Sequence, residues 1–317
     1  MTAARTPTGN STIGKYVMFH ELEPSETDGK TRVWYGRAAN MVSAYLEGEA
    51  GAALSRPDNP DEYFVWALLT PVVVTAGDQR VEVPAGSVVI VPPGASSVEL
   101  AENGSAWIGF TANATDLLDK CLNPEDYAEI PPNIAPIEAW PMPKDGYRIR
   151  VYDLETCAPA GKSRCFRHRT ALTNFGWPIR HAPRNPRTLS PHTHDDFEQV
   201  SLFYAGTQIH HMRRAWARDS TQWMPDEHIV CSAPSIAISQ PPDVHTTQAV
   251  TTGGPVGLID FFAPPRWDFS NVEGMVVNAD EYPLPDEEPK SYALADGIYA
   301  ADDPRSALNS RATAKRQ

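Results

Sequence analysis

The stretch 191-PHTHDDFEQV-200 indicates which fold and which kind of site to expect in this chain. His192 and His194 are separated by one residue, and Glu198 follows just before the sequence turns apolar. Side chains at positions i and i+2 of a β-strand point to the same face, so the two imidazoles would stand side by side. Imidazole and carboxylate ligands together suit Fe(II), Zn(II), Mn(II) or Ni(II). The stretch therefore predicts a site for one divalent transition metal, with a solvated His-rich loop as the alternative.

A second stretch, 235-SIAISQPPDVHTTQAV-250, supplies a further ligand. A β-like run reaches a Pro-Pro turn, and His245 stands at the entry to the next β-like run. We therefore expect His192, His194, Glu198 and His245 to surround the metal. Four protein ligands leave one or two positions open on a five- or six-coordinate ion, which is typical of a catalytic metal.

The composition limits the classes of partner. The chain has 317 residues and a formal net charge of −13, which argues against nucleic acid or an anionic membrane as the main partner. Neither a membrane-length apolar run nor a signal-like apolar segment is present, so we expect a cytoplasmic protein that binds a small-molecule substrate. The four cysteines form no CxxC pair and are expected to be reduced thiols. The sequence is also compatible with a homo-oligomer.

The pattern along the chain predicts an all-β protein with few short helices. The 30 prolines favour short strands and turns over long helices. Two β-rich blocks of similar size indicate an internal duplication of a sandwich or barrel. The expected parts are an N-terminal arm, a first barrel, a linker, a second barrel and a C-terminal extension with a tail, at 1–32, 33–115, 116–147, 148–270 and 271–317.

The metal-ligand stretch resembles the first sequence motif of the cupin superfamily, in which HxH is followed by Glu and then by Gly. Here these positions are His192, His194, Glu198 and Gly206. The second cupin motif keeps its histidine as His245, although other residues replace its glycines and proline. The resemblance implies a double-stranded β-helix, or jelly-roll, barrel for this block.

The first block resembles the second cupin motif from Gly86 through Pro92 and Gly94, but Ser97 stands at the position of the histidine. No HxH pair precedes it. The resemblance therefore implies a bicupin in which the first barrel is degenerate and metal-free and the second binds the metal.

The identity of the carboxylate ligand is ambiguous by one residue. Counting six intervening residues back from Gly206 leads to Gln199 instead of Glu198. Strand alternation puts Glu198 on one face with Val200 and Leu202. A ligand followed by aliphatic residues suits a barrel interior, so we take Glu198 as the predicted ligand, with Gln199 as the alternative.

The order of the motifs is also similar to that of the bicupin ketouronate isomerases and 5-deoxyglucuronate isomerases. It runs through PHTHDDFEQVSLFY, HHM, DEHIV and GLIDFF, although the acid follows after three residues instead of four. This resemblance implies a metal-dependent isomerase of a keto-sugar or sugar acid. The alternatives are a mononuclear Fe(II) dioxygenase and a non-enzymatic bicupin that binds a sugar or a metal.

An isomerase would need a base and a group that holds the substrate. The candidate bases are His211, His210 and Glu227, and strand alternation allows at most one of the two histidines to point into the barrel. Guanidinium groups bind carboxylates through two hydrogen bonds. The candidate substrate-binding arginines are Arg180, Arg187 and Arg213. Tyr204 is a further substrate-binding candidate. For the dioxygenase alternative, Phe197, Tyr204, Trp216 and Trp223 are the candidates for a pocket wall around an aromatic or diketone substrate, with packing in the barrel core and in a hairpin as the other interpretation.

Overall fold

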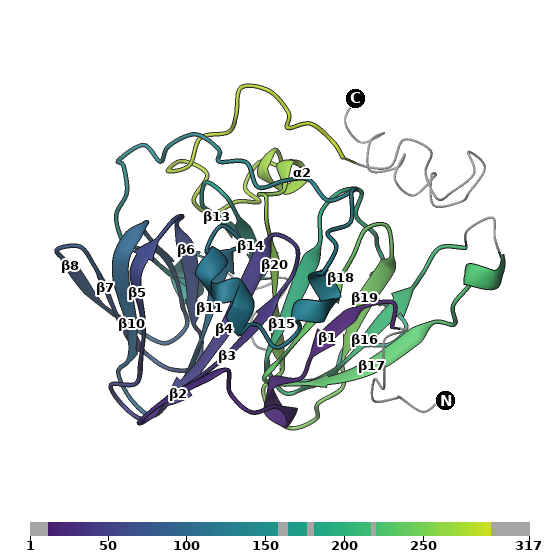
Figure 1. Ribbon diagram of the computed structural model, residues 1–317, viewed down its shortest axis with the longest axis horizontal. Helices are drawn as coiled ribbons and strands as arrows, with labels where there is room; N and C mark the ends of the chain where they lie inside the picture. The colour runs from purple at the N-terminus through teal and green to yellow at the C-terminus, as the bar shows by residue number, and fades with distance from the viewer. Residues whose placement is uncertain (1–11, 158–163, 176–180, 217–219, 293–317) are drawn as a thin grey trace.

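The computed structural model describes residues 12–157, 164–175, 181–216 and 220–292. These residues form four antiparallel β-sheets, which Figure 1 shows as two neighbouring barrels. None of the described helices is long and apolar enough to cross a bilayer. The helices are η1 (Phe19–Glu21), η2 (Thr115–Lys120), η3 (Pro124–Tyr127), α1 (Leu154–Cys157), η4 (Ser220–Gln222) and α2 (Trp267–Ser270).

The first barrel pairs a seven-stranded sheet, in the order β12-β9-β6-β11-β4-β3-β2, with a four-stranded sheet, β5-β10-β7-β8. Its interior is filled by apolar side chains such as Val65, Val74, Val98 and Phe110, all fully buried. The strands are β2 (Glu26–Asp28), β3 (Thr31–Arg37), β4 (Met41–Gly48), β5 (Ala53–Asn59), β6 (Tyr63–Ala67), β7 (Val72–Ala76), β8 (Gln79–Val83), β9 (Ser87–Val91), β10 (Gly94–Leu100), β11 (Gly104–Thr111) and β12 (Arg150–Asp153).

The second barrel pairs a six-stranded sheet, in the order β1-β18-β15-β20-β14-β13, with a three-stranded sheet, β17-β16-β19. Polar side chains such as Gln199, Ser201 and His210 are buried in part of its interior. The strands are β1 (Lys15–Val17), β13 (Arg164–Arg167), β14 (Leu172–Phe175), β15 (Gln199–Ala205), β16 (Thr207–Arg213), β17 (Glu227–Ser232), β18 (Ser235–Ser239), β19 (Val244–Ala249) and β20 (Gly257–Phe262).

Each barrel takes a strand from beyond the part of the chain expected to form it. Strand β1, in the expected N-terminal arm, pairs with β18 of the second barrel and lies beside it in Figure 1. Strand β12 follows the linker but pairs with β9 of the first barrel. The two barrels are therefore joined by strand exchange as well as by the linker.

The two large sheets pack face to face and form the largest apolar core among the described residues. Trp66 and Trp107 from the first barrel share this core with Val200, Leu202 and Phe261 from the second. Strand β15 consequently has the first barrel on one face and its own barrel interior on the other. All seven of its residues are buried.

Candidate metal centre

Three histidines meet at one end of the second barrel. His192 and His194 lie in the loop before β15, and His245 is the second residue of β19. The His192 N–H donates to the His245 carbonyl at 3.1 Å, and the His245 N–H donates back at 2.9 Å. The side-chain atoms that could bind an ion, one from each of the three histidines, all lie within 4.8 Å of one another. The backbone thus brings together imidazoles that are about fifty residues apart in the chain.

The donor atoms of this cluster fit a divalent metal. His194 and His245 are 4% and 2% exposed, and the Nε2 atom of each is buried without a hydrogen-bond partner among the described residues. Burial lowers the pKa of both imidazoles well below the ordinary value. Both rings are therefore neutral, which is the form that binds metals. His192 lies at the exposed rim, where its Nδ1–H donates to the Ser190 carbonyl at 2.9 Å.

Glu198 does not lie with the three histidines. Its carboxylate accepts hydrogen bonds from the Ala39 N–H at 2.7 Å, the Tyr127 hydroxyl at 2.8 Å and the Gln240 amide at 2.9 Å. Glu198 immediately precedes β15, and its side chain is on the side that packs against the first barrel. The aliphatic residues that suggested a barrel interior mark this inter-barrel face instead, because the sheet is buried on both sides.

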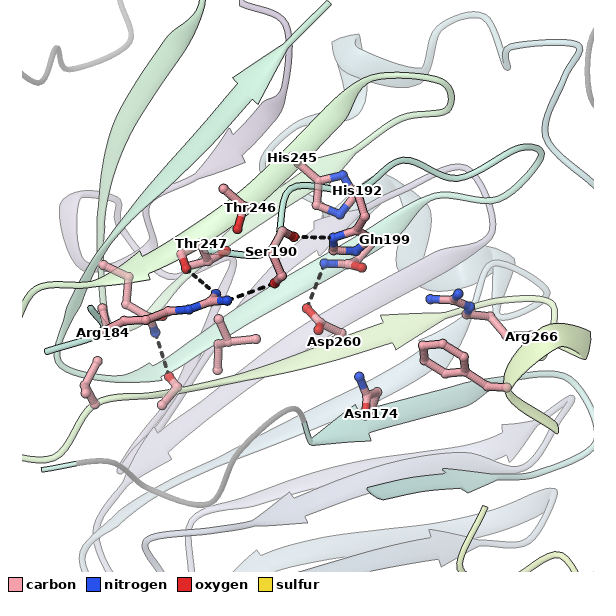
Figure 2. Close-up of a pocket in the computed structure, with 16 residues that line it drawn as sticks. Asn174, Arg184, Ser190, His192, Gln199, His245, Thr246, Thr247, Asp260 and Arg266 are labelled. Carbon is pink, nitrogen blue, oxygen red and sulfur yellow. Dashed lines mark hydrogen bonds between the residues drawn. The ribbon is translucent and has the colours of Figure 1, made fainter. Parts of the chain in front are cut away.

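Gln199 points to the cavity side of β15. Its Nε2 donates to the Ser201 hydroxyl at 3.0 Å and to the Asp260 carboxylate at 2.9 Å. Figure 2 shows Gln199 between His192 and Asp260. Gln199, the alternative that the spacing to Gly206 indicated, is thus the residue on the same side as the histidines. Its side chain is a neutral amide and not a carboxylate.

Asp260 is a candidate functional residue of the cavity wall that the sequence motifs did not reveal. It lies in β20, inside the stretch GLIDFF, and also accepts a hydrogen bond from the Ser201 hydroxyl at 2.8 Å. Burial raises the pKa of Asp260 to about 6, while the Ser201 hydrogen bond and the charge of Arg266 act in the opposite direction. Asp260 therefore titrates close to neutral pH.

A cavity of about 360 Å³ adjoins the cluster, and His192, His245, Gln199 and Asp260 form part of its wall. Figure 2 shows two arginines on opposite sides of it. The other lining residues include Asn174, Arg184, Ser190, Gln208, Thr246, Thr247, Arg266 and Phe269.

The two cavity arginines are held in different ways. Arg184 donates to the Thr247 carbonyl at 2.8 Å and to the Ser190 hydroxyl at 2.9 Å. Arg266 is 8% exposed, is bound to Asp268 through two hydrogen bonds, and lies among aromatic rings. Those rings are Phe197, Phe262 and Phe269, whose centroids are 4.8, 5.0 and 3.4 Å from the guanidinium carbon. Neither arginine belongs to a recognisable motif, so spacing could not reveal them.

Of the two adjacent histidines in β16, only His210 points into the barrel. It is fully buried, with Nδ1 2.9 Å from the Thr247 hydroxyl and Nε2 3.1 Å from the Ser239 hydroxyl. Burial lowers the pKa of His210 to about 3. Its ring is 5.9 Å from that of His245, and both of its nitrogens already have partners. His210 therefore packs behind the cluster and is not part of the cavity wall.

The other two candidate bases lie away from the cavity. His211, on the opposite face of β16, has its Nδ1 2.8 Å from Nδ1 of His228. Glu227 accepts hydrogen bonds from the N-terminal arm, from the Ile13 and Gly14 N–H groups and the Tyr16 hydroxyl.

Of the three arginines chosen from the sequence, the two that the structure describes do not line the cavity. Arg213 is exposed and forms two hydrogen bonds with Asp226, at 2.8 and 2.5 Å. Arg187 is exposed in the loop before the HxH pair. Arg180 lies outside the described residues.

The aromatic candidates are divided among three places. Tyr204 is buried in the core between the barrels. Trp216 and Trp223 are 66% and 45% exposed and stack on each other. Only Phe197 is near the cluster, where its ring stacks on His194 with the centroids 4.5 Å apart.

Comparison with known proteins identifies the fold but no family and no curated relative of this chain. No family model matches the chain, and no curated protein matches it. A structure of oxalate decarboxylase from work on a reaction specificity switch is 12% identical, with a TM-score of 0.56, and the match covers 82% of this chain and 79% of that one. The formate complex of the Lactobacillus farciminis oxalate decarboxylase is 11% identical, with a TM-score of 0.55 and coverage of 83% and 88%.

A single-residue mutant of Bacillus subtilis oxalate decarboxylase matches similarly, with 11% identity, a TM-score of 0.53 and coverage of 83% and 82%. These matches confirm the predicted all-β bicupin fold. At such low identity they show the fold alone, and they lend no specific support to the ketouronate isomerases.

Proposed function

We propose that the second barrel binds one divalent transition metal through His192, His194 and His245, and that the protein is a metal-dependent isomerase of a small keto-sugar acid. The observation that carries this proposal is the pair of buried Nε2 atoms of His194 and His245, which have no hydrogen-bond partner among the described residues and lie beside a cavity with charged side chains in its wall. A bound Fe, Zn, Mn or Ni ion would act as a Lewis acid toward a substrate carbonyl oxygen.

The charges of the cavity wall support an anionic substrate. Arg184 and Arg266 bring guanidinium groups to the wall. Arg266 is paired with Asp268, yet its positive charge still acts to lower the pKa of Asp260 and of all three histidines. Guanidinium groups bind carboxylates with matched geometry. A substrate carboxylate would therefore be attracted to this cavity despite the negative net charge of the chain.

The uncharged part of the wall supports a substrate with several hydroxyl groups. Asn174, Gln208, Thr246 and Thr247 add amide and hydroxyl side chains that donate and accept hydrogen bonds. A pocket that orients its ligand through such groups discriminates strongly against analogues that lack them. These four side chains suit the hydroxyl groups of a sugar acid.

Asp260 takes the role of base that the sequence had suggested for His211, His210 or Glu227. Isomerisation moves a proton between adjacent carbons, so one group must accept the proton and then return it. A carboxyl with a pKa of about 6 can do both near neutral pH. Gln199 and Ser201 donate to this carboxylate and would hold its orientation.

The second candidate function is a mononuclear Fe(II) dioxygenase. It is favoured by the aromatic end of the site, where Phe197 stacks on His194 and further rings surround Arg266. An aromatic or diketone substrate could pack there.

The test is anaerobic purification, metal analysis, and incubation with a panel of keto-uronates and other keto-sugar acids. Oxalate belongs in the panel because the matched structures are oxalate decarboxylases. Oxygen-independent interconversion of keto and aldehyde forms, lost when the metal is removed, would support the isomerase. Oxygen consumption would favour the dioxygenase, and metal binding without turnover would favour a binding protein. A folded preparation that takes up no transition metal would overturn the proposal.

A further inference from the structure

Glu198 joins three separate parts of the chain at one buried point. Its donors are Ala39 in the first barrel, Tyr127 in the linker and Gln240 in the turn before β19. The residue is 1% exposed. Hydrogen bonds to a carboxylate are stronger than hydrogen bonds between neutral groups. Removal of the carboxylate would leave the three donors without this buried acceptor, which destabilises the folded state.

The linker also contacts both segments that carry the histidine cluster. The Ala135 N–H donates to the Asp196 carbonyl at 2.7 Å, two residues after His194. The Asn133 amide donates to the Pro241 carbonyl at 3.2 Å, four residues before His245. The linker therefore spans from one histidine-bearing segment to the other.

We propose that these contacts set the metal affinity of the second barrel, with Glu198 as the positioning residue. We call Tyr127, Asn133, Ala135, Glu198 and Gln240 the linker clasp. The inference rests on the proposed metal site. It adds that the affinity of this site for metal depends on the linker between the barrels.

The physical reason is preorganisation. The HxH pair lies in a loop, and the turn that leads to His245 at the start of β19 lies outside the sheet, so both segments depend partly on contacts other than strand pairing. An ion must find all the imidazole nitrogens within a few ångströms, and any freedom of the two segments is lost when it binds. By fixing both segments beforehand, the linker clasp reduces that entropic cost.

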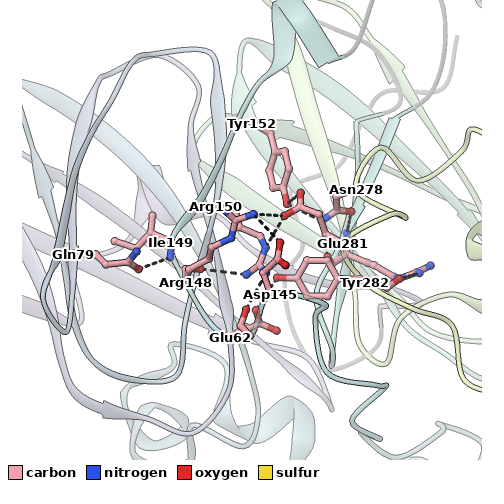
Figure 3. A network of polar contacts seen from close by, with 12 residues as sticks. Glu62, Gln79, Asp145, Arg148, Ile149, Arg150, Tyr152, Asn278, Glu281 and Tyr282 are labelled. Carbon is pink, nitrogen blue, oxygen red and sulfur yellow. Dashed lines mark hydrogen bonds and ion pairs between the residues drawn. The ribbon is translucent and has the colours of Figure 1, made fainter.

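Glu62 provides a matched control within the same molecule. It is 2% exposed and accepts a hydrogen bond from the Tyr282 hydroxyl at 2.7 Å and from the Arg169 N–H at 3.4 Å. Burial raises the pKa of Glu62 as it does that of Glu198. Figure 3 shows Glu62 and Tyr282 in a polar network with Arg150 and Glu281. This network supports the barrels but includes no residue of the histidine-bearing segments.

The experiment compares the full-length Glu198→Ala and Glu62→Ala variants after removal of metal. Zinc affinity is measured by competition with a chromophoric chelator, and the melting temperature is measured on the same samples. We expect both variants to melt earlier, whereas only Glu198→Ala should bind zinc about ten- to a hundredfold more weakly, as when the groups that orient metal ligands are removed. Equal zinc affinity in Glu198→Ala and the unaltered protein, or an equal loss in both variants, would overturn the inference.

A milder pair keeps the test decisive if Glu198→Ala does not fold. Tyr127→Phe and Tyr282→Phe each remove one hydroxyl from a buried carboxylate. We expect zinc binding to weaken several-fold in Tyr127→Phe and to stay unchanged in Tyr282→Phe. Unchanged binding in both variants would contradict the inference. Absence of zinc binding by the unaltered protein would instead refute the proposed metal site itself.

Discussion

His192 and His245 exchange two backbone hydrogen bonds, at 3.1 and 2.9 Å, so the loop with the HxH pair is joined to β19 at the histidines themselves. Their imidazole rings lie 4.4 Å apart. The backbone contact explains why a loop residue and a strand residue can share one ion. It also suggests that the geometry of the cluster depends on the segments that support it.

Replacement of His194 or His245 by Ala should remove most of the bound metal. Each change deletes one of three imidazole ligands, which should weaken binding by more than about a hundredfold, because loss of groups that merely orient the ligands already costs 10- to 100-fold. The measurement is metal content after dialysis, by mass spectrometry. The control is His211→Ala. His211 lies on the opposite face of β16 from His210 and is not part of the histidine cluster, so this variant should keep its metal. Retention of metal by His194→Ala would exclude the proposed ligand set.

Replacement of Asp260 by Asn should lower kcat by about 10²- to 10⁴-fold while leaving the metal bound, because it removes the proposed proton acceptor. In the unaltered protein, kcat/KM should fall as the pH drops below about 6, where the carboxylate becomes protonated. The pH-rate profile measures this. Glu227→Gln, a change to a carboxyl held by the N-terminal arm, should have little effect. An unchanged acid limb in Asp260→Asn would show that another group titrates.

Replacement of Arg266 by Met should raise KM for an anionic substrate about tenfold or more, with a smaller effect on kcat. The methionine can still pack among the phenylalanine rings, so the main loss is the positive charge. Steady-state kinetics separate the two parameters. Arg213→Met removes an exposed arginine paired with Asp226 and should leave KM unchanged. Equal effects of the two substitutions would mean that Arg266 has no specific contact with substrate.

Replacement of His168 by Leu should reduce the pH dependence of stability in mildly acidic solution. Burial lowers the pKa of His168 to about 3, so below about pH 6.5 the unfolded chain binds a proton that the folded chain does not. The histidine therefore costs about 1.4 kcal/mol of stability for each pH unit between about 6.5 and 3. The free energy of unfolding, measured by urea unfolding at several pH values from 5 to 7, should change less steeply with pH in the variant than in the unaltered protein. The same pH dependence in the variant and the unaltered protein would mean that His168 ionises similarly in the folded and unfolded states.

The sequence determined the duplicated β-rich architecture and three of the residues around the proposed ion. The period-2 patterns and their punctuation by Pro and Gly are local properties of the chain, and they predict strands without knowledge of tertiary contacts. His192 and His194 share a short motif, and His245 follows a recognisable turn. Such short-range signals survive in a single sequence.

Only the tertiary structure decided which face of β15 meets the histidines. Alternation separates Glu198 from Gln199, but it does not say which side of a doubly buried strand faces the barrel interior. The packing of the first barrel against one side answers that question and turns Glu198 into an inter-barrel acceptor. Asp260 and Arg266 likewise enter the site from β20 and the segment after it, because folding brings together side chains that no sequence spacing relates to the HxH pair.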